Sequence, residues 1–212
     1  MNSRASIIKA AIEVFAEKGK HGARMEEIGA RAKVNKAMVY YYFSSKKNLF
    51  REVMVVILRQ VFSCIFDTLN QDGDRLADPL AKVQAAVSAH FDAFARNPNL
   101  AKITLNAIAD DPDDVRHALQ IIRQESDVFL PEKLLSIFEE GTKQGTFRKI
   151  DPKQTMISII GMNLVYFVGA PIAQTVLDLQ IIDEKEFQAE RKRAILDLLL
   201  HGIVERGPLH EE

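Results

Sequence analysis

Residues 24–49 read RMEEIGARAKVNKAMVYYYFSSKKNL, and the apolar residues in this stretch recur at helical spacing on both sides of a short break. Side chains three and four residues apart lie on one face of a helix, so each half can bury one side. The apolar positions are Met25, Ile28 and Ala32 in the first half and Val39 and Phe43 in the second. Residues 33–35 form the turn between them. The stretch predicts a helix-turn-helix.

The second of these helices has an unusual outward side. Asn35 can cap it, since an asparagine side-chain oxygen accepts a hydrogen bond from a free backbone N–H of the first turn. The outward positions are Lys36, Ala37, Tyr40, Tyr41 and Ser44. A helix this short does not need so many exposed aromatic residues for stability. The pattern therefore favours a recognition helix that lies in the major groove of DNA.

Residues 28–50, IGARAKVNKAMVYYYFSSKKNLF, resemble the DNA-binding signature of the TetR family of bacterial transcriptional regulators. The most specific part is VYYYFSSKKNL, where the family usually has a hydrophobic residue, Tyr, two aromatic or His positions, Phe, a short polar pair, Lys, two variable residues and Leu. The upstream stretch IIKAAIEVFAEKGKHGARM is similar to the family's first helix. The motif covers about the first quarter of the chain, and the remainder is similar in helical character and length.

Three positions depart from the family pattern. Arg24 stands where a capping Thr or Ser is usual, Lys33 replaces the usual turn glycine, and Lys47 replaces the usual acidic residue. The departures leave the predicted fold unchanged. Arg24 leaves the helix that follows it without the usual Thr or Ser cap.

Apolar periodicity, glycines and prolines predict helices along the rest of the chain. Besides the two helices of the helix-turn-helix, the expected helices are 3–18, 46–70, 80–95, 100–109, 115–141 with a kink or split at Pro131, 156–173 and 184–204. We therefore expect an all-α chain of about nine helices. A three-helix DNA-binding domain would occupy residues 1–48, and a larger helical ligand-sensing and dimerisation domain residues 49–212.

Residues 156–173, MISIIGMNLVYFVGAPIA, are apolar on every side of the expected helix and nearly long enough to span a bilayer. Ser158, Asn163 and Pro171 interrupt the segment, and no basic flank accompanies it, so burial against a partner subunit is the preferred interpretation. The last helix places on one stripe Phe187, Ile195, Leu198, Leu199, Gly202 and Ile203. These two helices from each subunit could form a four-helix interface, as the family's do, and a dimer suits two DNA half-sites.

Composition and charge agree with a soluble DNA-binding protein. The 212 residues are 47% hydrophobic and 27% charged, with a formal net charge of -1. The charge is uneven, because residues 1–50 hold ten Lys or Arg against four Glu, whereas the others hold 18 against 25 acidic residues. A basic module joined to an acidic one fits a specific DNA reader, and scattered surface charge is the alternative. The N-terminus lacks the pattern of a secretory signal, so we expect a cytoplasmic protein.

The expected DNA contacts divide between base reading and backbone positioning. Two lysines in the first turn of the helix that starts at Lys46 are unfavourable beside the positive end of its macrodipole, unless an anion such as a phosphate lies nearby. A solvated lysine pair is the alternative. In the family, residues at the positions of Lys36, Ala37, Met38 and Tyr41 read bases, although Met38 and Tyr41 could instead pack in the core. The expected DNA-binding residues are Asn35, Lys36, Ala37, Met38, Tyr40, Tyr41, Tyr42, Ser45 and Lys46.

The larger domain carries aromatic, sulfur and isolated polar side chains that suit an adaptable pocket for a small, largely apolar ligand. The candidate ligand-binding residues are Phe62, Phe66, His90, Phe91, Phe94, Asn106, Met162, Asn163 and Tyr166. Phe residues at helical spacing are more often core residues, and lone His and Asn residues are more often hydrogen-bonded structure than ligand contacts, so these alternatives stay open.

An enzyme is the competing class, and the sequence gives it no support. The five His residues show no metal-ligand spacing, and there is no Gly-rich phosphate loop and no G-x-S-x-G motif. We therefore expect no catalytic residue, no metal and no cofactor. Cys64 lies among apolar residues, which favours a structural thiol over a redox sensor. A DNA-binding scaffold without a small-molecule ligand shares every N-terminal feature and remains the alternative to a regulator.

Overall fold

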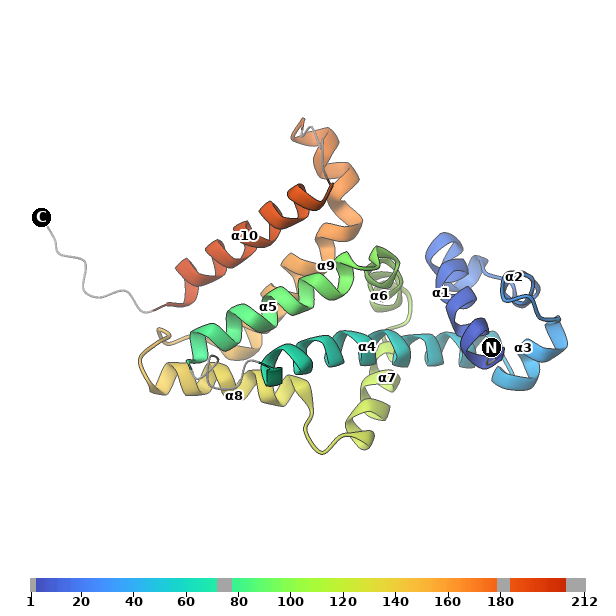
Figure 1. Cartoon of the computed structure of the whole chain (residues 1–212), viewed down its shortest axis with the longest axis horizontal. Helices are drawn as coiled ribbons and strands as arrows, with labels where there is room; N and C mark the ends of the chain where they lie inside the picture. Colours follow the sequence, from blue (N-terminus) through green and yellow to red (C-terminus); the bar gives the residue numbers. More distant parts are fainter. Residues whose placement is uncertain (1–2, 72–77, 179–183, 205–212) are drawn as a thin grey trace, which may run out of the picture. The chain divides into compact units, whose positions relative to one another are not determined.

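A computed structural model describes residues 3–71, 78–178 and 184–204 (Figure 1). Within these residues the chain forms ten α-helices and no strand, which confirms the all-α prediction. The helices are α1 Ser3–Gly22, α2 Met25–Arg31, α3 Lys36–Phe43, α4 Lys46–Gln71, α5 Pro79–Ala95, α6 Pro98–Asp110, α7 Pro112–Glu125, α8 Leu130–Lys143, α9 Pro152–Val176 and α10 Glu184–Ile203. The tenth arises because the segment predicted as 115–141 is two helices.

Proline and short polar caps set several of these boundaries. Each helix from α5 to α9 has a proline at its first or second position, where the missing N–H would have no partner within the helix. Pro131 therefore lies in the first turn of α8 rather than kinking a longer helix. The side chain of Asp78 accepts from the backbone N–H of Ala81 at the start of α5. At the other end of the chain, Gly19 has a non-helical φ of 69° and kinks α1 directly after residue 18, where the helix was expected to end, and a further short helical turn runs to Gly22.

The chain divides into two compact units. Unit 1 comprises residues 1–61 and 97–127, and unit 2 comprises residues 62–96 and 128–212. In unit 1, α1 packs on α2 and α6, α2 packs on α3, and α6 packs on α7. The helix α4 belongs to both units, with the division after Val61. The division expected from the sequence, a DNA-binding domain over residues 1–48 and a ligand-sensing domain over 49–212, is a division by function, and it stays a prediction.

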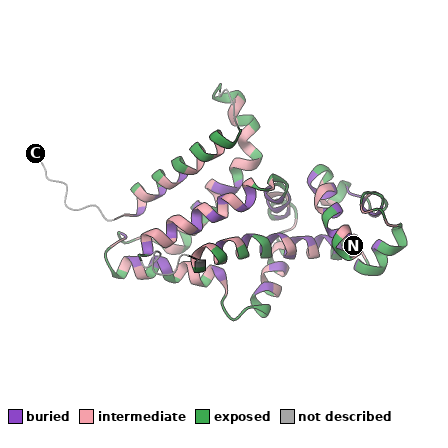
Figure 2. Ribbon diagram, viewed as in Figure 1, coloured by how far each residue is buried: buried purple, intermediate pink, exposed green. Residues whose placement is uncertain are grey.

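Each unit has its own apolar core. In unit 1 the rings of Phe15 on α1 and Phe50 on α4 meet edge to face with centroids 4.9 Å apart. In unit 2, α5 packs on α8, α9 and α10. The core residues of unit 2 are Val83, Val87, Phe91, Ile137, Phe138, Phe147, Ile159, Ile195, Leu199 and Ile203. Figure 2 shows buried stripes along α4 and α5 and a mostly exposed surface on α3.

Two C-terminal helices expose a large apolar surface. Among the described helices, α9 is the one long and apolar enough to cross a membrane, yet its apolar side chains are interrupted by Pro171. The exposed apolar residues of these two helices are Ile157, Ile160, Val165, Val168, Ile172, Val176 and Leu198. The predicted single stripe on α10 was wrong in one respect. Leu198 is 63% exposed, whereas Leu199 is buried in the core of unit 2, because the two neighbours point about 100° apart on the helix.

Candidate DNA interface and ligand site

A close contact between α2 and α3 shapes the helix-turn-helix. The backbone N–H of Val34 donates to the carbonyl oxygen of Gly29 at 2.9 Å. A Cβ added to Gly29 would lie 3.0 Å from the carbonyl oxygen of Val34, so any larger residue would push the turn away. Lys33 adopts a φ of 59°, the left-handed conformation that a glycine usually supplies at this turn. The sequence showed that Lys33 replaces a glycine but did not indicate that Gly29 is needed for the helices to approach.

The helix α3 presents an exposed aromatic face. The side-chain oxygen of Asn35 accepts from the backbone N–H of Met38 at 2.8 Å, which confirms the predicted cap. Arg24, by contrast, makes no side-chain cap on α2. Val39 and Phe43 are buried, and Tyr41 is 80% exposed, so its side chain does not pack in the core of unit 1. Ala37, Met38, Tyr40 and Tyr42 are exposed as well.

Lys36 is engaged within the free protein. Its ammonium forms an ion pair with the carboxylate of Glu26 on α2 and lies 5.7 Å from the centre of the Tyr40 ring. The hydrogen bond to Glu26 raises the pKa of Lys36, so the lysine is fully charged near neutral pH. About half of each of the two paired side chains is exposed to solvent. A contact between Lys36 and a DNA acceptor would therefore compete with this ion pair.

Lys46 has a structural partner that the sequence argument did not foresee. Its ammonium donates to the backbone carbonyl of His21 at 2.8 Å and to that of Ala23 at 3.0 Å. These carbonyls, at and just after the end of α1, balance the cation at the start of α4 in the free protein, and the expected phosphate contact of Lys46 stays a prediction. Ser45 caps α4, because its hydroxyl accepts from the backbone N–H of Asn48 at 3.1 Å. One of the three N–H groups of Lys46 remains for a phosphate.

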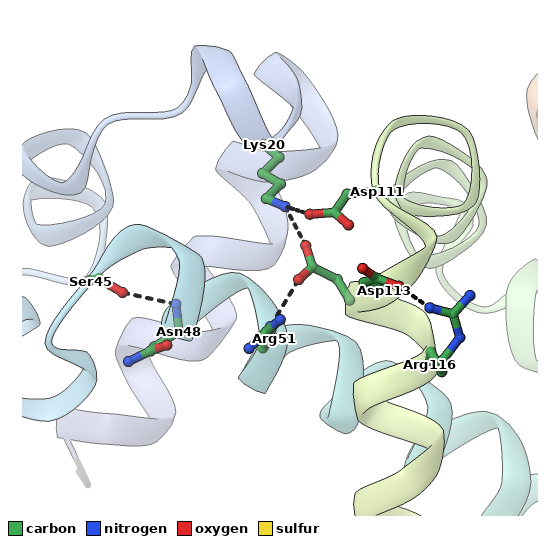
Figure 3. Close-up of polar contacts among 8 residues, drawn as sticks. Lys20, Ser45, Asn48, Arg51, Asp111, Asp113 and Arg116 are labelled. Atoms are coloured by element: carbon green, nitrogen blue, oxygen red, sulfur yellow. Dashed lines mark hydrogen bonds and ion pairs between the residues drawn. The ribbon is translucent and has the colours of Figure 1, made fainter.

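A buried carboxylate joins three helices of unit 1. Asp114, in the first turn of α7, is 0% exposed and accepts from Arg51 Nε on α4 at 3.0 Å and from Lys20 Nζ on α1. Lys20 also donates to Asp111 at 2.9 Å, and Figure 3 shows the Lys20 side chain pointing toward Asp111. Burial alone would lower the pKa of Lys20, but the hydrogen bonds to Asp114 and Asp111 outweigh it and raise that pKa. Sequence reasoning missed this cluster, because the run DDPDD does not indicate which carboxylate is buried.

Five of the candidate ligand-binding residues meet in unit 2. The side-chain nitrogen of Asn163 on α9 lies 2.9 Å from Nδ1 of His90 on α5 and 3.1 Å from the carbonyl oxygen of Val87. The His90 and Phe94 rings are in edge contact, and the Phe91 ring stacks on Tyr166 with centroids 5.6 Å apart. Burial lowers the pKa of His90 to about 4, so its ring is neutral at pH 7.

The other candidates lie elsewhere. Phe62 contacts Phe129, and Lys133 lies over the Phe66 ring, so these two aromatic residues of α4 face the start of α8. Met162 packs against the core of unit 2. Asn106 is on α6 in unit 1, whereas Asn163 and His90 belong to unit 2.

Two residues beside the aromatic cluster were not predicted as ligand contacts. Phe167 contacts both Phe91 and Phe94, with ring centroids 5.0 and 6.2 Å apart. Arg191 on α10 lies with its guanidinium carbon 5.9 Å from the centre of the Tyr166 ring. Phe167 could have been included from the sequence, because it is an aromatic residue next to Tyr166. Arg191 could not, because α10 carries several charged residues and the sequence does not show which of them lies beside the aromatic cluster.

Cys64 is the single cysteine of the chain and lies on α4. The Cys64 thiol lies 3.5 Å from the carbonyl oxygen of Ala89 and is partly buried, in keeping with a structural role. Over the described ranges of the chain, no group of three or more His, Cys, Asp or Glu residues could hold a metal ion.

Two protein-family models match this chain, one near its N-terminus and one over most of the remainder. The family model described as "Bacterial regulatory proteins, tetR family" matches residues 7–53, and a second, described as "Tetracyclin repressor-like, C-terminal domain", matches residues 79–199. The chain is similar to the HTH-type transcriptional repressor NicS of Pseudomonas putida, with 28% identity over 95% of this chain and 92% of that protein. It is also similar to the fatty acid metabolism regulator protein of Bacillus subtilis, with 24% identity over 93% of each.

Solved structures show the same fold. The transcriptional regulator FadR from Bacillus subtilis, in complex with stearoyl-CoA, matches with a TM-score of 0.71 and 22% identity, over 93% of this chain and 98% of that one. The regulator PfmR from Thermus thermophilus matches with a TM-score of 0.70 and 22% identity, over 94% of this chain and 99% of that one.

Proposed function

Because this chain belongs to the tetR family of bacterial regulatory proteins, we propose that it represses transcription from a palindromic operator and releases the operator when a small, largely apolar ligand binds. It is a DNA-binding transcriptional regulator, and proteins of this kind act on DNA as dimers rather than as enzymes. A cytoplasmic location follows from that role. The alternative is a DNA-binding scaffold of the same fold with no small-molecule ligand.

The exposed face of α3 carries the proposal. A helix that buries only Val39 and Phe43 and leaves three tyrosines exposed has a surface suited to the major groove. We assign base reading to Lys36, Ala37, Met38 and Tyr41, and backbone contacts to Tyr40, Tyr42, Ser45 and Lys46, with Asn35 fixing the start of the helix. Lys36 can donate to guanine once it leaves Glu26, whereas Ala37 and Met38 can contact thymine methyl groups.

The apolar surface of α9 and α10 supports dimerisation. Large exposed apolar residues run along α9 from Ile157 to Val176, and Leu198 on α10 is exposed as well. Contiguous apolar surface of this kind marks a protein interface. Two copies paired there would present two copies of α3 to half-sites about 34 Å apart.

The continuous helix α4 is the proposed link between ligand and DNA. It begins beside α3 with the Ser45 cap and ends in unit 2, where Phe62 and Phe66 face α8. A ligand that binds one arrangement of this helix more tightly than the other would change the separation of the two recognition helices. Its effect cannot exceed its differential affinity for the two states, and DNA must weaken ligand binding by the same factor.

Selection of bound sequences from random DNA tests the DNA-binding assignment. We expect a palindrome with two half-sites, and we expect Lys36→Ala to change the preferred bases. Lys102→Ala, which removes an exposed lysine from α6, is the matched control and should leave the preference unchanged. A Lys36→Ala variant that loses affinity equally for all sequences would show that Lys36 contacts phosphate rather than bases.

Ligand titration separates the regulator from the scaffold. A compound found by thermal-shift screening would be titrated into the free protein and into its complex with the selected operator. The regulator requires weaker binding to the complex, with a ratio typically between about 5 and 150. Equal affinities would show that the two sites are uncoupled and would favour the scaffold.

A further inference from the structure

One buried polar atom in unit 2 has no partner. Asn163 is 0% exposed, and its side-chain oxygen makes no hydrogen bond to any described part of the chain. Buried polar groups in folded proteins are nearly always hydrogen-bonded, because leaving one unpaired costs much of its lost hydration. An unpaired buried acceptor therefore points to a partner that the protein alone does not supply.

The orientation of this amide is determined by its neighbours. The carbonyl oxygen of Val87 can only accept, so the atom 3.1 Å from it must be the amide nitrogen. The second hydrogen of that nitrogen points at Nδ1 of His90, 2.9 Å away, which must then be the unprotonated ring nitrogen. Flipping the amide would place two acceptors against each other. The free oxygen of Asn163 is thus a fixed feature of the site and requires a donor.

The surroundings of Asn163 are aromatic and apolar. Phe91 and Phe94 are buried, and the Phe91 ring contacts both Tyr166 and Phe167. Arg191 borders the same cluster beside Tyr166, and its Nε is also buried without a partner. The cluster therefore holds an unpaired acceptor and an unpaired donor. A hydroxyl group can serve both, whereas an ether or a carboxylate has no hydrogen to offer Asn163.

We propose that Asn163 is the specificity-determining residue of the ligand site and that it selects an apolar molecule bearing an uncharged hydroxyl group, whose O–H donates to the Asn163 side-chain oxygen. This inference rests on the proposed ligand-responsive function and names the chemistry of its ligand. His90 acts as a positioning residue, because it holds the amide nitrogen and so keeps the oxygen available. A site built around a hydrogen bond to a hydroxyl rejects analogues that lack it, since the polar group would stay unpaired.

Three probes of equal chain length test this proposal. Decanol can donate a hydrogen bond, decyl methyl ether can only accept, and decanoate is an anion. Binding of each to the full-length wild-type protein would be measured by calorimetry, and again with Asn163→Leu. Gln154→Leu is the matched control, because it makes the same amide-to-leucine change at an exposed position of the same helix. Melting temperatures of the free variants would be recorded alongside.

We expect the wild-type protein to bind decanol about tenfold more tightly than the ether, which corresponds to one hydrogen bond to a buried group. In Asn163→Leu that ratio should fall to about one, while Gln154→Leu should keep it. The melting temperature of free Asn163→Leu should fall below that of Gln154→Leu, because leucine leaves Nδ1 of His90 and the carbonyl oxygen of Val87 without the amide donor.

Several results would overturn the proposal. They are equal or tighter binding of the ether, tightest binding of decanoate, and a decanol preference that survives in Asn163→Leu. If Asn163→Leu does not fold, the wild-type ranking of the three probes still decides the question. If no probe binds, the cluster around Asn163 is not the ligand site. That failure leaves the operator-binding test of the proposed function unaffected, so the two can be told apart.

Discussion

Replacing Asp114 by Asn should destabilise the protein far more than the same replacement at Asp113. Both residues lie in the first turn of α7, where a negative charge is favoured by the helix macrodipole. Asp114→Asn removes the negative charge shared by Lys20 and Arg51, and its amide can accept from only one of these cations while its N–H hydrogens face the other. Asp113 pairs with Arg116 at the surface, as Figure 3 shows, so its replacement removes the same formal charge without exposing a buried cation.

The magnitude follows from burial. Removing one partner of a buried ion pair typically costs about 3–5 kcal/mol, because the remaining charge is left uncompensated. The lower end applies here, since Lys20 keeps its bond to Asp111 and the Arg51 side chain is 28% exposed. A loss of about 3 kcal/mol corresponds to a fall of about 6–12 °C in melting temperature for a chain of this length. The Asp113–Arg116 pair is about two-thirds exposed on each side, so its loss should cost less than about 1 kcal/mol.

Thermal denaturation followed by circular dichroism, at one protein concentration for all variants, measures this difference. The concentration must be constant because dimerisation contributes to the apparent stability. Equal melting temperatures for Asp114→Asn and Asp113→Asn would refute the reasoning, because they would show that the bonds of Asp114 to Lys20 and Arg51 add nothing beyond the helix dipole.

Three further predictions concern DNA binding, pH and assembly. Glu26→Gln should strengthen operator binding by up to about fivefold in fluorescence anisotropy, since it releases Lys36 from an exposed ion pair; weaker binding would show that the pair positions Lys36. The folded protein depresses the pKa of His90 to about 4, so the unfolded chain binds a proton first as the pH falls. The free energy of unfolding should therefore decrease between about pH 6.5 and 4, by up to about 3 kcal/mol, and urea denaturation should show no such decrease from this site in His90→Gln. Val165→Glu should convert the dimer to a monomer in sedimentation, because pairing would bury one unpaired charge per subunit at a position that is 54% exposed in the single chain; an unchanged dimer would exclude α9 from the interface.

Local features of the chain were predictable from the sequence. The Asn35 cap, the turn before it and the buried Val39 and Phe43 all depend on residues within a few positions of one another. The start of α8 at Leu130, next to Pro131, has the same origin, although the sequence left open whether the proline would kink or split a longer helix. Backbone chemistry and helical periodicity act over these short distances, so a motif is enough to predict them.

The partners of charged and polar side chains needed the tertiary structure. Asp114 meets Lys20 across 94 residues, and Asn163 meets Val87 across 76. Lys46 is likewise balanced by carbonyls at and just after the end of α1 in the free protein. Thus the sequence alone determined an all-α chain with a helix-turn-helix, whereas the fold decided which of several similar carboxylates and amides lost contact with water. The reason is that the burial of a polar group, and hence its energetic effect, depends on helices brought together from distant parts of the chain.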